Sequence, residues 1–219
     1  MMMLKSRYLT AVVLGLGLIG TVHGDSILTF EMSGPNAVKE TRTVSITGRW
    51  LRIDTDQQGG PDYTLMDTGR MLMFEVDDKE KSYKTTHMGK YYWPKDVKPR
   101  LKPMREKGVV AGKRCRKIHE VVGSKHALNH CMLPGTELGL DERSTKTLSR
   151  LYQLSRRMKL DWIGAMTPDE RQISISSQDL KSGATLKFTS ILHKGIPDNK
   201  FKIPDSYQRI KVEQKKYKH

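Results

Sequence analysis

Between residues 25 and 86, apolar and polar positions alternate in short runs that are separated by turn-forming residues. Val44 and Ile46 fall on one face of an extended chain, with serine and threonine on the other face, which is the period-two pattern of a half-buried strand. Because the connections are short and parallel neighbours need long crossovers, the runs predict an antiparallel meander. The predicted strands are residues 27–32, 41–47, 50–54, 63–67, 71–76 and 81–85.

The alternation stops between residues 88 and 107, where aromatic, basic and proline residues are interleaved. Three prolines within ten residues, Pro94, Pro99 and Pro103, oppose a regular strand or a long helix. One interpretation is a mobile basic and aromatic flap over a binding cavity, since tyrosine and tryptophan combine apolar area with a polar tip. The other interpretation is an ordinary surface connection whose aromatic side chains pack into the core.

The only two cysteines, Cys115 and Cys131, lie symmetrically about Gly123 within an extended stretch at 112–133. Two strands that fold back around a turn at 123–125 bring Cys115 opposite Cys131. An even number of cysteines favours a disulfide if the chain is exported. The sequence therefore predicts a hairpin stapled by one disulfide.

One amphipathic helix is predicted after this hairpin, from Asp141 as its N-cap to Met158. Leu148 and Leu151 fall within its apolar arc, and basic side chains lie opposite. Further strands are predicted at 172–177, 184–193 and 208–212. Together these elements predict an α+β, mostly β fold in which one main amphipathic helix packs on an antiparallel sheet.

Residues 1–24 have the features of a secretory signal peptide. Lys5 and Arg7 precede an apolar stretch of about 12 residues, which is short for crossing a bilayer, and small residues fit a cleavage site after Gly24. An uncleaved membrane anchor is the alternative. The mature chain is expected to form a single domain over residues 25–212, followed by a flexible basic tail at 213–219. These features predict a periplasmic protein that is peripheral to the membrane at most.

The formal net charge of the whole chain is +15, and it is unevenly distributed. Residues 25–78 carry 5 basic and 10 acidic residues, whereas residues 79–117 carry 14 basic and 3 acidic residues. A strongly basic surface attracts anions, and lipid phosphates, lipopolysaccharide and acidic polysaccharide are the plausible anions outside the cytoplasm. The signal peptide argues against nucleic acid as the partner. A basic surface that only aids solubility is the alternative.

Three histidines, His119, His126 and His130, cluster around the cysteines at spacings that resemble those of a metal site. Side chains alternate between the faces of a hairpin, so His119 is expected on the cysteine face and the other two on the opposite face. A single ion cannot reach them all without breaking the hairpin. We therefore expect a disulfide and no metal.

No motif of a catalytic nucleophile, a metalloprotease, a phosphate-binding loop or a dinucleotide site occurs in the sequence. The carboxylate pairs at 77–78 and 169–170 fall at predicted turns, where solvated charges are usual. His87 and His193 remain candidates for catalysis with partners that are distant in sequence. The sequence therefore favours a non-enzymatic protein with no catalytic residue and no cofactor.

Short motifs are spread over most of the mature chain: TVSITGRWLRID at 43–54, DKEKSY at 78–83, GKRC at 112–115, LGL at 138–140 and FKIPDSY at 201–207. Together they resemble an uncharacterised bacterial periplasmic family, a domain of unknown function. That family resembles the periplasmic lipoprotein carriers (LolA-like proteins) in fold, a curved and incompletely closed antiparallel half barrel with helices over its concave side. The resemblance implies an apolar ligand, such as an acyl chain, between the sheet and the predicted helix.

The leading hypothesis is a periplasmic, non-enzymatic binding or carrier protein for an amphipathic, anionic, lipid-like or lipoprotein ligand. The apolar part of the ligand is assigned to a cavity lined by Trp50, Trp93, Leu148 and Leu151. Its head group is assigned to the basic residues Lys95, Lys98, Arg100, Lys102 and Arg105. The alternative is a cell-envelope interaction or structural protein whose basic face docks on a protein partner or an acidic polysaccharide.

Overall fold

The computed structural model describes residues 24–34, 39–55, 61–88, 99–122, 126–157 and 169–211. The predicted signal peptide, apart from Gly24, and the predicted basic tail lie outside these residues. Among the described residues, no helix is both long enough and apolar enough to cross a membrane.

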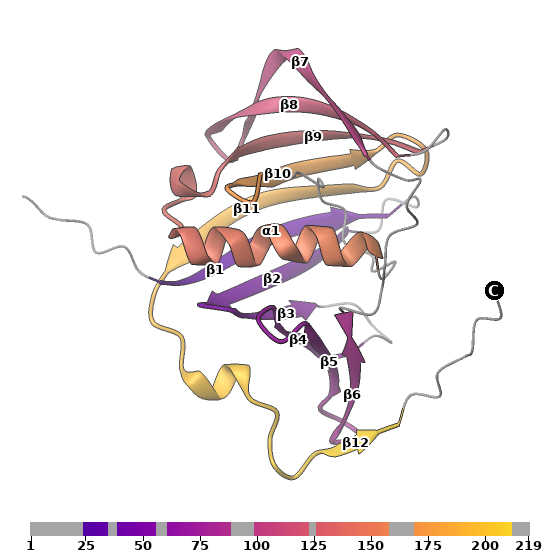
Figure 1. Ribbon diagram of the computed structural model, residues 1–219, viewed down its shortest axis with the longest axis vertical. Helices are drawn as coiled ribbons and strands as arrows, with labels where there is room; N and C mark the ends of the chain where they lie inside the picture. Colours follow the sequence, from indigo (N-terminus) through magenta and orange to yellow (C-terminus); the bar gives the residue numbers. More distant parts are fainter. Residues whose placement is uncertain are drawn as a thin grey trace, which may run out of the picture.

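Twelve strands form one sheet in the order β12-β6-β5-β4-β3-β2-β1-β11-β10-β9-β8-β7. The sheet curves around α1 and does not close into a barrel, so β12 and β7 form its two edges (Figure 1). The predicted fold class, a mostly β half barrel with one main helix, is confirmed. The strands are β1 (Asp25–Ser33), β2 (Lys39–Thr47), β3 (Trp50–Thr55), β4 (Tyr63–Asp67), β5 (Leu72–Asp77), β6 (Ser82–His87), β7 (Arg100–Val110), β8 (Lys113–Val122), β9 (His126–Pro134), β10 (Gln172–Asp179), β11 (Thr185–His193) and β12 (Gln208–Ile210).

Strands β1 to β6 form the predicted antiparallel meander, each pairing with the next along the chain. Val44 lies opposite both Leu28 and Ile53, and all three belong to one buried core cluster. We call the face that carries this cluster and α1 the inner face. The alternation in sequence thus corresponds to an apolar inner face and a more polar outer face.

Helix α1 (Glu142–Arg157) lies across the inner face, in front of β1 and β2 (Figure 1). Asp141 caps its start, because the Ser144 backbone N–H donates to Asp141 Oδ1 at 2.6 Å. Leu148 and Leu151 are fully buried in the inner core, as the apolar arc predicted. The Leu154 side chain and Met158 lie outside the described part of the chain.

The buried side of α1 also carries hydroxyl groups that hydrogen-bond to the backbone of the sheet and its turns. Thr147 Oγ1 donates to the Gly48 carbonyl oxygen at 2.8 Å, which ties the helix to the turn between β2 and β3. Tyr152 Oη donates to the Ser174 carbonyl oxygen in β10 at 2.7 Å. These bonds compensate for the burial of polar groups in the helix interface.

The segment after β11 crosses the outer face of the sheet before it reaches the β6 edge (Figure 1). It includes the short 3-10 helix η3 (Asp198–Phe201). Ile196 and Phe201 pack there with the outward side chains of β4 and β5, and Trp50 packs against the same cluster. The chain then adds β12 parallel to β6, an exception to the predicted antiparallel sheet that the long crossing makes possible.

Strand β7 corrects the prediction that the proline-rich segment lacks a regular strand. Residues 100–110 pair with β8, but the register shifts between Pro103 and Lys107. Proline lacks a backbone N–H, and it is tolerated in sheets at edges and bulges. Pro103 occupies such a place, at a bulge in an edge strand.

The β8–β9 hairpin confirms the Cys115–Cys131 disulfide, whose Cα atoms lie 5.4 Å apart. The predicted register is wrong, however, because Cys131 lies opposite Lys117 and Cys115 lies opposite Gly108 of β7. The observed pairing is symmetric about position 124, whereas the predicted pairing was symmetric about position 123. The β8 residue opposite each β9 residue is therefore two positions later than predicted. A shift of two keeps every side chain on its predicted face, and the disulfide forms diagonally.

Candidate functional site

A hollow of about 480 Å³ lies next to the disulfide, where β7 approaches β9 and β10. Its volume falls within the range of small-molecule sites. We call it the β7 hollow. Its lining residues are Met104, Lys107, Gly108, Val109, Val110, Lys117, Asn129, His130, Cys131, Ser176 and Gln178.

The lining combines apolar and cationic side chains. Met104 and Val109 are apolar yet 38% and 68% exposed, whereas Val110 reaches the inner core cluster. Lys107 and Lys117 also line the hollow. Exposed apolar side chains rimmed by charge are typical of interaction sites, so the chemistry of the β7 hollow suits a ligand with an apolar part and a negative charge.

The strands beside the hollow carry a dense group of positive charges. Residues 100–117 contain eight basic side chains and one carboxylate, Glu106. Seven of the eight are exposed, and the side chain of Lys117 is 40% exposed. We call these eight side chains the basic edge: Arg100, Lys102, Arg105, Lys107, Lys113, Arg114, Arg116 and Lys117.

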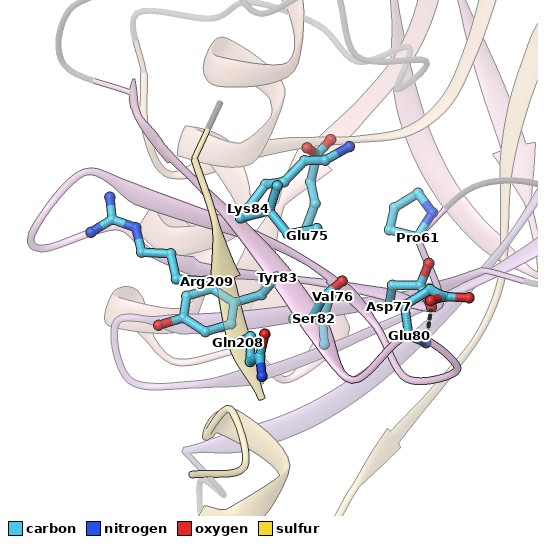
Figure 2. A pocket seen from close by; sticks show the side chains of 11 residues that line it. Pro61, Glu75, Val76, Asp77, Glu80, Ser82, Tyr83, Lys84, Gln208 and Arg209 are labelled. Atoms are coloured by element: carbon cyan, nitrogen blue, oxygen red, sulfur yellow. Dashed lines mark hydrogen bonds between the residues drawn. The ribbon is translucent and has the colours of Figure 1, made fainter. Parts of the chain in front are cut away.

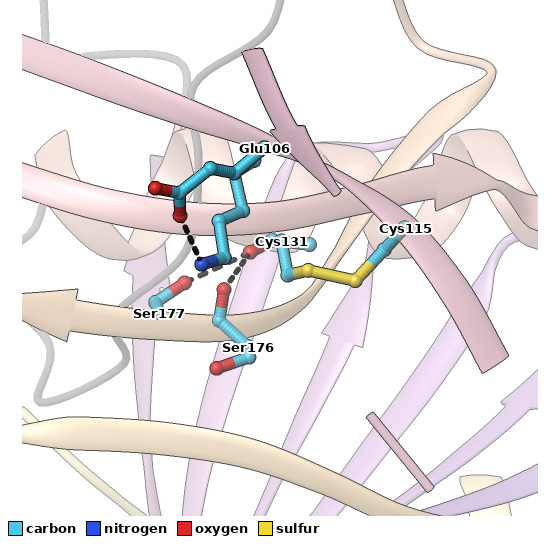
Figure 3. The surroundings of a disulfide bond; sticks show 7 residues. Glu106, Cys115, Cys131, Ser176 and Ser177 are labelled. Carbon is cyan, nitrogen blue, oxygen red and sulfur yellow. Dashed lines mark hydrogen bonds and ion pairs between the residues drawn. A yellow bond between two sulfur atoms is a disulfide. The ribbon is translucent and has the colours of Figure 1, made fainter. Parts of the chain in front are cut away.

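Glu106 and Lys117 form an ion pair, with Glu106 Oε2 and Lys117 Nζ 2.8 Å apart (Figure 3). The hydrogen bond from Lys117 and its charge hold the pKa of Glu106 below its ordinary value. Glu106 is therefore ionised in neutral solution.

Gly108 allows β7 to lie directly against the disulfide. A Cβ atom at this position would be 2.3 Å from Cys131 Sγ and 3.2 Å from Cys115 Sγ. No real Cβ contact is as short as the first of these, so glycine is the residue that fits this position. The disulfide therefore lies directly against β7 at Gly108.

We expect Gly108→Ala to lower the free energy of unfolding by about 1–3 kcal/mol, the usual cost of overpacking. Urea denaturation of the oxidised protein measures this loss. Gly195→Ala is the matched control, because a Cβ there meets nothing within 4 Å. In a Cys115→Ala/Cys131→Ala background the cost of Gly108→Ala should shrink. An equal cost in both backgrounds would show that the disulfide is not what the methyl group meets.

The predicted head-group residues fall into two sets. Arg100, Lys102 and Arg105 are exposed on β7 and belong to the basic edge. Lys95 and Lys98 lie outside the described residues, as does Trp93 of the predicted apolar cavity.

The structure does not bring the other predicted cavity residues together. Leu148 and Leu151 are fully buried in the inner core. Trp50 lies on the outer face, where it packs against the cluster of Tyr63 and Phe201. Since neighbouring strand residues point to opposite faces, the inward position of Leu51 requires Trp50 to point outward.

Sequence reasoning missed a buried polar network that spans β8, β9 and β10. His130 Nε2 lies 2.7 Å from Glu120 Oε2, and His130 Nδ1 lies 2.8 Å from Ser177 Oγ. Ser177 Oγ is also 2.8 Å from Ser174 Oγ. All four side chains are at most 2% exposed.

Hydrolases use serine, histidine and a carboxylate in a similar combination, but Ser177 is 1% exposed and lines neither the β7 hollow nor the hollow at the opposite edge. A nucleophile without access to substrate has no catalytic use. The network instead joins three neighbouring strands. The predicted register hides this network, because it places Arg116 opposite His130. In the structure Ile118 lies opposite His130, so Glu120 is the diagonal neighbour of the imidazole.

The remaining histidines with described side chains have separate places. His119 Nδ1 is 2.9 Å from Asn129 Oδ1 on the cysteine face. His193 bridges Ser26 Oγ and the Leu138 carbonyl oxygen, and His87 is exposed. The side chain of His126 lies outside the part of the chain that the structure describes. Among the described residues, no three histidine, cysteine or acidic side chains gather as metal ligands.

A second hollow of about 510 Å³ lies at the opposite edge, among β5, β6 and β12 (Figure 2). Its charged lining mixes both signs, with Glu75, Asp77 and Glu80 against Lys84 and Arg209. The three carboxylates outnumber the two cations. This hollow therefore attracts an anionic ligand less than the β7 hollow does.

No family model and no curated protein matches this chain. Among solved structures, an uncharacterized conserved protein from Thermus thermophilus is similar, with a TM-score of 0.51 at 10% identity over 86% of this chain and 90% of that chain. This likeness supports the fold alone.

Two structures that contain MucB are less similar. MucB itself has a TM-score of 0.45 at 10% identity, over 84% of this chain and 59% of that chain. The Pseudomonas aeruginosa MucA/MucB complex has a TM-score of 0.46 at 13% identity, over 86% and 58%. This chain spans less than two thirds of those MucB chains, and a likeness of this degree indicates nothing about its function.

Proposed function

We propose that this protein is a periplasmic, non-enzymatic binding or carrier protein whose ligand is an anionic amphiphile held in the β7 hollow. The sequence features of a signal peptide and the disulfide between Cys115 and Cys131 support an oxidising compartment outside the cytoplasm. The ligand class is a lipid-like molecule with a short acyl chain and a negatively charged head group.

The observation that carries this proposal is the composition of the β7 hollow. Met104, Val109 and Val110 offer apolar contact for a chain, and Lys107 and Lys117 offer charge for a head group. The other cations of the basic edge raise the local concentration of anions. Leu148 and Leu151, between which and the sheet the sequence placed the ligand, are fully buried and belong to the inner core cluster.

The second candidate function is docking on an acidic protein or polysaccharide of the cell envelope. It is favoured by six side chains of the basic edge that are exposed and do not line the hollow: Arg100, Lys102, Arg105, Lys113, Arg114 and Arg116. Such a surface contact is screened by salt and needs no hollow.

Calorimetric titration with dodecyl phosphate below its micelle concentration tests the proposed function. We expect binding at one site that is tighter than the binding of inorganic phosphate, because the chain adds apolar burial. In the variant Lys107→Gln/Lys117→Gln the affinity should fall by about tenfold, since charge contacts near the surface are worth about 1 kcal/mol or less each. The matched control is Lys39→Gln/Lys79→Gln, two exposed lysines far along the chain from the β7 hollow.

Calorimetric titration with polygalacturonate, an acidic polysaccharide, tests the second candidate function. Binding of polygalacturonate without binding of dodecyl phosphate would replace the first proposal with the second. An affinity for dodecyl phosphate that both double variants lower equally would contradict the placement of the ligand in the β7 hollow.

A further inference from the structure

We infer that Glu106 competes with the ligand for Lys117. Its carboxylate is paired with the Lys117 ammonium group that the head group of a ligand would contact. This inference rests on the proposed function and narrows its ligand class. A head group must exchange places with the carboxylate, so phosphate monoesters are favoured over simple carboxylates.

Glu106 is unusual in its surroundings. It is the single acidic residue between positions 99 and 119, a stretch with eight basic side chains. Many cations lie near it in sequence, and Glu106 forms its ion pair with Lys117, one of the two lysines that line the β7 hollow. The ion pair therefore lies at the site itself.

The geometry of β7 lets the carboxylate leave without breaking the sheet. The register of β7 with β8 jumps from Pro103–Ile118 to Lys107–Arg116, so residues 104–106 have no pairing partner in β8. Glu106 thus lies on a bulge, and its side chain is 70% exposed. Bulges re-aim side chains and interrupt the ladder locally, so this carboxylate can turn away while the paired parts of β7 stay in place.

The ion pair between Glu106 and Lys117 is weak enough for a ligand to displace the carboxylate. Exposed ion pairs contribute little to stability because water screens them and two long side chains must be held in place. A ligand carboxylate would replace the Glu106 carboxylate with an equivalent group and gain little from Lys117. A phosphate monoester carries more charge and more acceptor oxygens, so it gains from the exchange.

The test compares Glu106→Gln with the unaltered protein in titrations with dodecyl phosphate and with dodecanoate. Removing the competing charge should tighten the binding of both ligands by about two- to fivefold, the range that an exposed ion pair represents. The unaltered protein should prefer dodecyl phosphate. Glu31→Gln is the matched control, since it removes the same charge from an exposed position on β1.

A double-variant cycle separates competition from a merely structural role. In a Lys117→Met background, the gain from Glu106→Gln should disappear, because the contested ammonium is gone. Unfolding in urea should show a change in stability no larger than that of the control. A structural role would instead lower stability and leave the affinity unchanged or weaker.

The outcomes distinguish this inference from the function on which it rests. If the unaltered protein and Glu106→Gln both fail to bind dodecyl phosphate, the proposed function fails. If the unaltered protein binds but Glu106→Gln binds equally or more weakly, the inference alone is overturned. A gain that persists in the Lys117→Met background, or that Glu31→Gln reproduces, would also overturn it.

Discussion

His130→Leu should lower the free energy of unfolding by about 3–5 kcal/mol, because the buried Glu120 carboxylate loses the imidazole that lies 2.7 Å away. Both side chains are fully buried, so water cannot replace the lost partner. Urea denaturation at neutral pH, followed by circular dichroism, measures the loss. We expect the midpoint to move with little change in the slope.

Two further variants show whether the loss comes from the buried carboxylate. His119→Leu, on the opposite face of the same hairpin and half-buried, should cost about 1 kcal/mol or less. Glu120→Leu/His130→Leu should recover part of the stability, since replacing both members of a buried polar pair with apolar groups leaves neither member without the other. A His130→Leu protein within about 1 kcal/mol of the unaltered protein would contradict this account of the network.

Reduction of the Cys115–Cys131 disulfide should lower stability by about 3 kcal/mol, the value that the chain-entropy model assigns to a loop of this size. The loss should be local, because the disulfide joins β8 to β9 and supports β7 through Gly108. Amide hydrogen exchange in the reduced protein should therefore increase first in β7, β8 and β9, while strands β1 to β6 keep their protection.

Cys115→Ser/Cys131→Ser, measured without reductant, controls for effects of the reducing agent. Its exchange pattern should match that of the reduced protein. Loss of protection in β1 to β6 as early as in β7 to β9 would show that the disulfide supports the whole sheet and not this edge.

The elements that follow from local pattern were predicted correctly. Val44 and Ile46 alternate with polar residues and lie inward on β2, and Asp141 caps α1 at the predicted place. These features depend on residues that are close together in sequence. Side-chain periodicity and capping chemistry are therefore enough to locate them.

The features that depend on distant partners were not predicted. Pro103 made residues 100–107 look like a break, and only the position of β7 at a sheet edge explains why a strand tolerates it. The two strands of the hairpin were predicted, but their pairing differs from the predicted register and places Cys131 opposite Lys117. No periodicity in the sequence distinguishes these two registers, because both keep the same faces.

The assignment of residues to a ligand head group stays a prediction, and the structure gives only the positions of these residues. The basic residues Arg100, Lys102 and Arg105 are exposed on β7. The apolar partners were assigned to the helix side, whereas the exposed apolar side chains near this surface are Met104 and Val109. The hollow joins residues from four strands, β7 to β10, and its existence depends on how β7 curls toward β9 and β10.

Photochemical labelling with a dodecyl phosphate analogue that carries a diazirine on its chain tests the ligand position most directly. Peptide mapping after irradiation should find the label on residues 104–110 of β7, and the Lys107→Gln/Lys117→Gln variant should lose it. Labelling of the helix face at Leu148 and Leu151, or of the β5–β6 edge, would contradict the placement of the ligand in the β7 hollow.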